Sequence, residues 1–180
     1  MLETIKAKIR KEYRVRIKKM SIEDIKIETW RQQGMKLGSN VHIYSDIYSK
    51  EPYMISIDDD TTISGDVTLV THDNSISKYL SQYTDVFGEI SIGKKCFIGM
   101  GSMIMPGVTL ADNTIVAAGS VVTKSVLEPG NVVGGVPAKI IGRVSELKEK
   151  NEKYGIDIRG MSLVEKREYL MSHEERLIKR

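Results

Sequence analysis

The sequence predicts a mainly β protein: a parallel β-helix of hexapeptide repeats with N-terminal and C-terminal helices. Two observations carry this prediction. Branched aliphatic residues recur at every sixth position through the middle of the chain, and 15 Gly stand against only 4 Pro among the 180 residues. A period of six residues is typical of parallel β-helices, in which each hexad supplies a short strand and a bend. Each coil contacts only its neighbours, so both ends need caps.

The first segment, residues 1–34, is expected to be basic and helical. Residues 1–20 hold eight Lys and Arg against two Glu, whereas the whole chain carries only +3. A basic amphipathic helix here either contacts anionic lipid weakly or packs on the body of the protein or on a neighbouring subunit. A second helix should begin after the N-cap Ser21, run to Gln33 and end at Gly34.

The repeat domain is expected to span residues 35–143, and it consists of two interleaved series. The inward aliphatic residues of the clearest stretch are Ile92, Ile98, Ile104, Leu110, Val116 and Val122. Mostly small residues stand two places before each of them: Ile90, Cys96, Ser102, Val108, Thr114 and Ser120. The same phase occurs upstream at Ile57, Ile63 and Leu69. These side chains should fill the interior of successive coils.

A long loop, residues 73–89, interrupts the period once. The six-residue period holds up to Leu69 and resumes at Ile90. A loop of this length inside a compact repeat is usually functional. His72 stands at the start of the loop and off the inward series. We therefore expect its imidazole to point outward at a corner and to have a chemical role.

The last segment, residues 144–180, is expected to be a helical tail, with a capping box from Ser162 to Glu165. No apolar run approaches the roughly 18–20 residues that span a bilayer. The small net charge and the 11 aromatic residues argue against a nucleic-acid partner. These features lead us to expect a cytoplasmic protein, either free or peripheral to the inner face of the membrane.

Cysteine and histidine usage argues against disulfide and metal chemistry. Cys96 is the single cysteine, and it occupies a small inward slot, so we expect a packing residue. The three histidines are His42, His72 and His173, and the last lies in the predicted tail. Two histidines on the repeat cannot supply a three-histidine zinc site. We therefore expect no metal.

Several motifs together resemble the left-handed β-helix hexapeptide acyltransferases. They are Thr71-His72-Asp73, the loop after it, residues 117–124 and residues 134–139, which contain Gly-Val-Pro-Ala-Lys. The similarity is to galactoside and maltose O-acetyltransferases and to the sugar O-acetyltransferases of surface-polysaccharide pathways. The resemblance implies a left-handed coil and a homotrimer, with three active sites between subunits and acetyl-CoA in the groove between two β-helices.

The resemblance also implies an acetyl-CoA-dependent O-acetyltransferase that acts on a sugar hydroxyl in capsule, exopolysaccharide or lipopolysaccharide biosynthesis. His72 would be the general base, and the acceptor oxygen would attack the thioester directly in a ternary complex. Neutral imidazole suits this task near pH 7. Other acceptors stay open, namely a nucleotide amino sugar, serine or an antibiotic. A scaffold protein without catalysis is the non-enzymatic alternative.

Further site residues follow from the same resemblance. Asp73 and Glu51 are candidates for contact with the acceptor. Asp73 could instead orient the imidazole or cap a turn. The expected cofactor-binding residues are Gly99, Met100, Ala118, Thr123, Lys124, Lys139 and Arg143. Met100 stands where the family usually has a small polar residue, and Lys139 offers a point charge where a relative can have the fork of an arginine.

Overall fold

The structure is a computed structural model, and it describes Val15, residues 21–47 and residues 49–179. Apart from Val15, the predicted basic segment at residues 1–20 lies outside this description. Among the described residues, no helix is long and apolar enough to cross a membrane.

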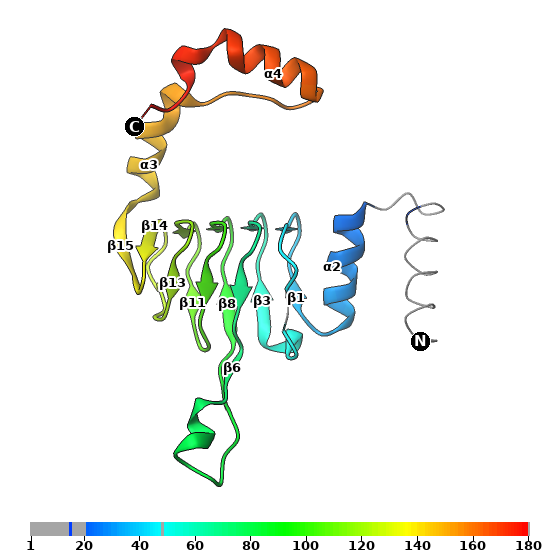
Figure 1. Ribbon diagram of the computed structural model, residues 1–180, viewed down its shortest axis with the longest axis vertical. Helices are drawn as coiled ribbons and strands as arrows, with labels where there is room; N and C mark the ends of the chain where they lie inside the picture. Colours follow the sequence, from blue (N-terminus) through cyan, green and yellow to red (C-terminus); the bar gives the residue numbers. More distant parts are fainter. Residues whose placement is uncertain (1–14, 16–20, 48, 180) are drawn as a thin grey trace.

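Helix α2 (Ile22–Gln32) opens the described chain and covers the first coil of the repeat (Figure 1). The predicted cap at Ser21 is present: its hydroxyl accepts from the Asp24 N–H at 3.0 Å, and the Asp24 carboxylate accepts from the Ser21 N–H at 3.1 Å. Ile25 is buried, and Ile27 and Trp30 pack against the main core. The apolar face of this helix therefore closes one end of the coil stack.

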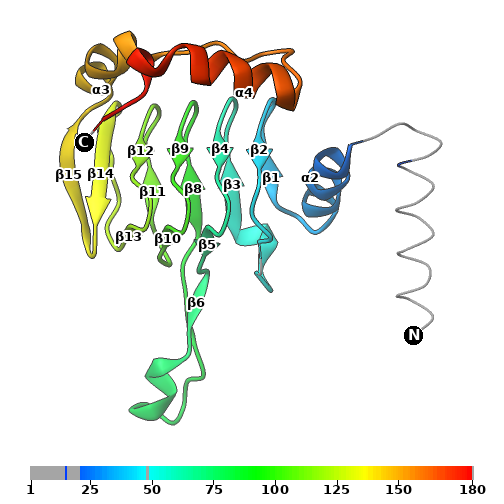
Figure 2. The same cartoon turned by 45° about the horizontal axis from the view of Figure 1, so that its top comes forward.

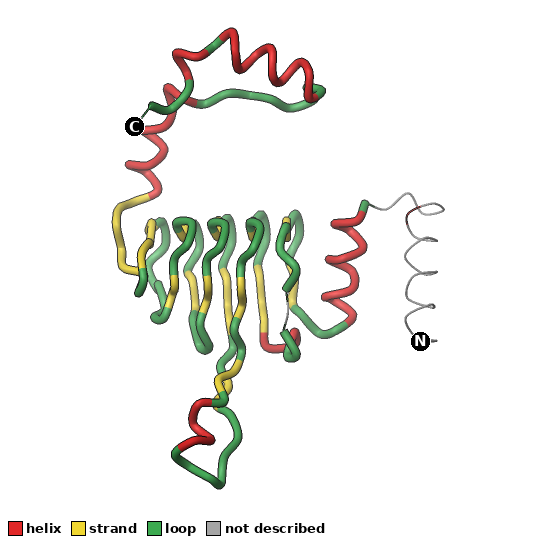
Figure 3. The backbone as a smooth tube through the Cα atoms, viewed as in Figure 1, coloured by secondary structure: helices red, strands yellow, loops and turns green. Residues whose placement is uncertain are grey.

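The body is a stack of coils, and each coil consists of short strands joined by turns (Figure 2 and Figure 3). Equivalent strands of successive coils pair with one another and form three parallel sheets. The first sheet holds β1 (Lys36–Leu37), β3 (Ile55–Ile57), β8 (Ile90–Ile92) and β11 (Thr109–Leu110). The second sheet holds β2 (His42–Ile43), β4 (Thr62–Ile63), β9 (Phe97–Ile98), β12 (Ile115–Val116) and β14 (Asn131–Gly135), with β15 (Ala138–Arg143) antiparallel at its edge. The third sheet holds β5 (Thr68–Leu69), β10 (Met103–Ile104) and β13 (Val121–Val122).

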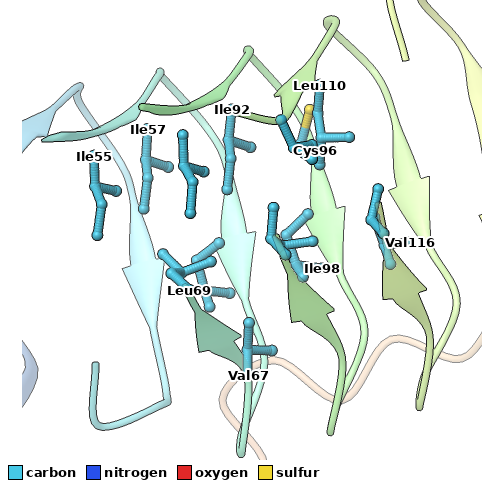
Figure 4. Close-up of a cluster of buried hydrophobic side chains, with 14 of the residues drawn as sticks. Ile55, Ile57, Val67, Leu69, Ile92, Cys96, Ile98, Leu110 and Val116 are labelled. Carbon is cyan, nitrogen blue, oxygen red and sulfur yellow. The ribbon is translucent and has the colours of Figure 1, made fainter. Parts of the chain in front are cut away.

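The strand register confirms the hexapeptide β-helix. Ile98 pairs with Val116 and Ile104 pairs with Val122, in both cases three hexads further along the chain. Each inward aliphatic thus stacks on the equivalent residue of the next coil. Most members of both inward series are fully buried and form one continuous core (Figure 4).

The small inward residues satisfy their polar atoms within the coils. The Thr61 hydroxyl donates to the Gly93 carbonyl at 2.8 Å, and the Ser102 hydroxyl donates to the Ala117 carbonyl at 3.0 Å. Cys96 is a buried free thiol, and burial raises its pKa to about 11. A thiol that stays protonated at neutral pH is a poor nucleophile, which agrees with the expected packing role.

The loop and the tail are the two departures from the coil stack. The loop stands on a two-stranded antiparallel ladder, β6 (His72–Asp73) and β7 (Val86–Phe87), and it projects away from the body (Figure 2). The tail contains α3 (Val144–Asn151) and α4 (Leu163–Ser172), and Ser162 and Glu165 form the predicted capping box. Short 3₁₀ turns complete the described chain: η1 (Pro52–Met54), η2 (Ser75–Lys78), η3 (Glu152–Tyr154) and η4 (Glu174–Arg176).

Candidate active site

His72 lies at the corner where the third sheet passes into the first, at the base of the projecting loop. It is the residue on β6 that pairs with Phe87 on β7, and the two rings are tilted with their centroids 5.6 Å apart. Its side chain is 36% exposed. The imidazole is thus fixed by the ladder on one side and accessible on the other.

Glu51 holds the imidazole from the preceding coil. Its Oε2 atom lies 3.0 Å from His72 Nδ1, and it also accepts the Thr71 hydroxyl at 2.7 Å. The hydrogen bond from Thr71 lowers the pKa of Glu51, and the contact with His72 and the charge of Lys50 act in the same direction against the effect of burial. Glu51 is therefore a carboxylate at neutral pH.

The ionised carboxylate determines the tautomer of His72. A carboxylate can only accept, so Nδ1 must carry the proton that it shares with Glu51. None of the described residues forms a hydrogen bond with Nε2. Within this part of the chain, the nitrogen keeps an unshared lone pair, which is the arrangement a general base needs.

Asp73 is engaged in its own turn. Its Oδ1 accepts the Ser75 N–H at 2.8 Å, and this hydrogen bond lowers the pKa of Asp73. The carboxylate that contacts His72 is Glu51, a residue that the sequence suggested only for contact with the acceptor. Asp73 therefore shapes the first turn of the loop, as the capping alternative describes.

Three of the expected cofactor-binding residues lie together at a different corner, between the second and third sheets. The Gly99 N–H donates to the Val116 carbonyl at 2.8 Å, and a Cβ atom on Gly99 would lie 2.5 Å from the Ala118 nitrogen. Only glycine fits this close approach of two coils. The exposed Met100 lies next to Gly99, and its methyl group is close to Gly65.

Two further expected residues, Lys124 and Lys139, line one groove at the end of the coil stack. The groove has a volume of about 490 Å³ and lies between the segment after β13 and the β14–β15 hairpin. Its apolar lining includes Leu127 and Ile140, both exposed. Two ammonium groups beside apolar walls could hold a long ligand with phosphate groups.

Thr123 and Arg143 are not part of this lining. Thr123 is an exposed residue directly before Lys124. The Arg143 guanidinium donates to the Asn131 side-chain oxygen at 2.7 Å, and its backbone N–H donates to Glu146 at the start of α3. Arg143 thus ties the hairpin to the tail. No group of three His, Cys, Asp or Glu side chains that could hold a metal ion occurs in the described part of the chain.

Comparisons with known proteins agree with this architecture. A family model, "Bacterial transferase hexapeptide (six repeats)", matches residues 89–124. Over 164 residues the chain is 34% identical to "Protein CapG" of Staphylococcus aureus, an alignment that covers 88% of this chain and 92% of that protein. The chain belongs to the hexapeptide-repeat acetyltransferase family.

Other hexapeptide-repeat acetyltransferases match over shorter stretches. The galactoside O-acetyltransferase of Escherichia coli is 33% identical over 61% of this chain, which spans only 57% of the length of that enzyme. A solved galactoside acetyltransferase in complex with coenzyme A has a TM-score of 0.50 at 29% identity, covering 63% of this chain and 62% of that one. A putative colanic acid biosynthesis acetyltransferase of Escherichia coli is 30% identical over 60% of this chain and 69% of its own length.

Two residues of the site were not among those expected from the sequence. Thr71 is buried and bonds to the carboxylate of Glu51, and Ser49 lies beside both residues. Thr71 belongs to the Thr71-His72-Asp73 motif of the resemblance, but the sequence assigned it no role of its own. Ser49 lies before Ile57, the first residue of the regular hexad phase, so its position relative to His72 could not be derived from the period.

Proposed function

We propose that this protein transfers an acetyl group from acetyl-CoA to a hydroxyl group of a sugar. The observation that carries the proposal is the Glu51–His72 pair at the base of the loop, because it presents a free Nε2 lone pair at an accessible corner. The match to a galactoside acetyltransferase bound to coenzyme A supports the cofactor. Bound acetyl-CoA supplies the acetyl group as a thioester.

The residues of this chain account for the proton transfers. His72 Nε2 takes the proton of the acceptor hydroxyl while the acceptor oxygen attacks the thioester carbon. The Glu51 carboxylate stabilises the imidazolium that forms, and the imidazolium returns the proton to the departing sulfur. A positioned base of this kind typically contributes about 10²–10⁴ in rate. The backbone N–H of Met100 would face the charge that develops on the thioester oxygen, because the Gly99 N–H is donated to the Val116 carbonyl.

The coenzyme would occupy the groove at the end of the coil stack. Lys124 and Lys139 would serve its phosphates, and Leu127 and Ile140 would contact its apolar parts. Neither Thr123 nor Arg143 lines the groove. In this proposal Thr123 stands beside Lys124, and Arg143 holds the hairpin that forms one wall of the groove.

We also propose a homotrimer with the active sites between copies. His72 lies between the third and first sheets, whereas Gly99, Met100 and Ala118 lie between the second and third sheets. These are different corners of the coil, which supports a site that a second copy completes. Light scattering should give three times the 20.2 kDa of the chain. Full activity at the monomer mass would contradict shared sites.

The acceptor class is proposed to be a sugar unit of a surface polysaccharide precursor, modified in the cytoplasm where acetyl-CoA is available. The likeness to a protein named "Putative colanic acid biosynthesis acetyltransferase" supports this class. The role of the basic segment at residues 1–20 stays a prediction, because it lies outside the described residues.

The test is a thiol-release screen with acetyl-CoA against monosaccharides, nucleotide sugars and oligosaccharides. Products are then treated with alkaline hydroxylamine, which cleaves esters and leaves amides intact. We expect thiol release with a sugar acceptor and a labile ester product. An alkali-stable product would indicate N-acetylation of an amino sugar. The absence of thiol release with every acceptor, serine and chloramphenicol included, would favour the scaffold alternative.

A further inference from the structure

Ser49, Thr71 and the backbone N–H of Glu51 form, together with the Glu51 carboxylate, a closed ring of hydrogen bonds. The Glu51 backbone N–H donates to Ser49 Oγ at 3.1 Å, and Ser49 Oγ lies 3.2 Å from Thr71 Oγ1. The Thr71 hydroxyl bonds to Glu51 Oε2 at 2.7 Å, and the same oxygen faces His72 Nδ1 at 3.0 Å. The ring thus begins at the backbone of Glu51 and returns to its side chain.

The direction of every bond in the ring follows from the charge on Glu51. An ionised carboxylate can only accept, so the single hydroxyl proton of Thr71 must point to Oε2. Ser49 must then donate its own proton to Thr71 Oγ1, while its oxygen accepts the Glu51 N–H. No hydroxyl in the ring is left with a choice of partner.

Because the ring is buried, a change in the direction of its hydrogen bonds is energetically unfavourable. Thr71 is only 2% exposed and the Glu51 side chain only 12% exposed. In such surroundings a hydrogen bond to a charged group is stronger than a neutral one, and a donor that loses its acceptor is costly. Oε2 is therefore held in one place, and His72 Nδ1 has one fixed acceptor.

We propose that Thr71 is a positioning residue for acetyl transfer: it locks the Glu51 carboxylate and thereby holds His72 in the tautomer that keeps Nε2 free. Thr71 need not touch either substrate for this role, since it acts through Glu51. The inference rests on the proposed function for its catalytic consequence, but the tautomer is a property of the chain alone.

The charged groups near the ring do not replace Thr71. Lys50 is the neighbour of Glu51 in the chain and influences it through its charge, without a hydrogen bond to it among the described contacts. The charge of His72 contributes weakly to the lowered pKa of Asp73, but the carboxylate of Asp73 is engaged by Ser75. Among these groups, Thr71 alone donates a hydrogen bond to the oxygen that faces His72.

The kinetic experiment compares Thr71→Val, Thr71→Ser and Thr114→Val. Val keeps the shape of Thr without the hydroxyl, and Ser keeps the hydroxyl. Thr114 is an equally buried control, because its hydroxyl donates to the Ala111 carbonyl and not to the site. For Thr71→Val we expect kcat to fall by about tenfold with both KM values within about twofold, by analogy with the outer partners of metal-bound histidines, whose removal typically costs about 10–100-fold. Thr71→Ser should restore most of kcat, and Thr114→Val should leave it within about twofold.

A double variant separates positioning from a general loss of structure. If Thr71 acts only through Glu51, Thr71→Val should change kcat less than about twofold when added to Glu51→Ala. A further tenfold loss in that background would overturn the inference, as would an unchanged kcat for Thr71→Val alone.

A spectroscopic measurement keeps the inference testable without any acceptor. In ¹⁵N-labelled protein, at a pH at which titration shows the imidazole to be neutral, the ring nitrogens of His72, assigned by their loss in His72→Ala, should report the Nδ1–H tautomer. Thr71→Val should shift them toward a mixture of tautomers, and Thr114→Val should not. An unchanged tautomer in Thr71→Val would overturn the inference even if acetyl transfer is found. The expected shift without acetyl transfer in the wild type would instead contradict the proposed function.

Discussion

The described part of the chain contains two histidine–glutamate pairs with the same separation. His42 Nδ1 lies 3.0 Å from Glu23 Oε1, and His72 Nδ1 lies 3.0 Å from Glu51 Oε2. The second ring nitrogen differs: His42 Nε2 lies 3.2 Å from the Asn40 side-chain oxygen, whereas no described residue forms a hydrogen bond with His72 Nε2. The carboxylates differ too, because the Glu23 side chain is 34% exposed and the Glu51 side chain 12%.

This difference shows that a carboxylate beside an imidazole is not a site by itself. His42 lies on β2 and Glu23 on α2, so their pair joins the N-terminal cap to the first coil, and its remaining nitrogen is used. The His72 pair lies at the base of the loop with one nitrogen unused and with a buried hydroxyl behind its carboxylate. Access to the free nitrogen and support behind the carboxylate distinguish a candidate base from a structural contact.

The largest expected effect removes one imidazole from each pair. His72→Ala should lower kcat for acetyl transfer by at least about a hundredfold, since it removes the base, whereas His42→Ala should leave kcat within about twofold. Steady-state thiol release measures both, with circular dichroism and light scattering as controls for folding and assembly. Near-normal turnover of His72→Ala, or an equal loss in His42→Ala, would break the comparison.

The next effect removes one carboxylate charge from each pair. Glu51→Gln should lower kcat by about 10–100-fold with little change in KM, because an amide cannot stabilise the imidazolium as a carboxylate does. Glu23→Gln is the matched control and should keep kcat close to that of the wild type. A loss confined to the acceptor KM in Glu51→Gln would instead support the contact with the acceptor that the sequence suggested.

A third prediction separates the base from the coenzyme groove. Lys139→Glu should raise KM for acetyl-CoA by about tenfold with a smaller effect on kcat, since a charged hydrogen bond to phosphate is worth about 1.5–3 kcal/mol. Lys139→Arg keeps the charge and is the control. If KM is unchanged in Lys139→Glu, Lys139 has no contact with the coenzyme.

The smallest expected effect is on stability. The pKa of Glu51 is lowered in the folded protein from its ordinary value of 4.5, so the carboxylate stabilises the fold above that pH and the contribution is lost as the pH falls through the folded pKa. Glu51→Gln should therefore lower the free energy of unfolding by about 1 kcal/mol at pH 7, and the difference should shrink below about pH 4.5. Urea unfolding at a fixed protein concentration measures it, and a difference that grows on acidification would contradict the assignment.

The fold was largely predictable because its pattern is local and repeated. Every coil needs an inward aliphatic residue at the same phase, so the buried positions of Ile98, Ile104 and Val116 can each be predicted from the period. The interruption after Leu69 located the loop, and His72 at its start was the natural candidate for chemistry. The helix caps at Ser21 and Ser162 were also readable, since a capping box is complete within four residues.

The partners of His72 were much less predictable. Asp73 is adjacent in the chain and suited an orienting role, but its carboxylate satisfies the Ser75 N–H, the nearer donor. Glu51 comes from the preceding coil and lies before Ile57, where the regular hexad phase begins. The groove that joins Lys124 to Lys139 likewise depends on how the β14–β15 hairpin folds back, which the repeat does not encode.

The sequence alone therefore determined the β-helix, its caps, its loop and the histidine at the loop base, because burial of regularly spaced aliphatic side chains leaves one solution for the backbone. Tertiary structure decided which carboxylate holds that histidine, which hydroxyl holds the carboxylate, and which of the two histidine–glutamate pairs keeps a free nitrogen. These are contacts between coils and across corners. They depend on the stacking and on the direction of single side chains, and a period of six residues leaves both unspecified.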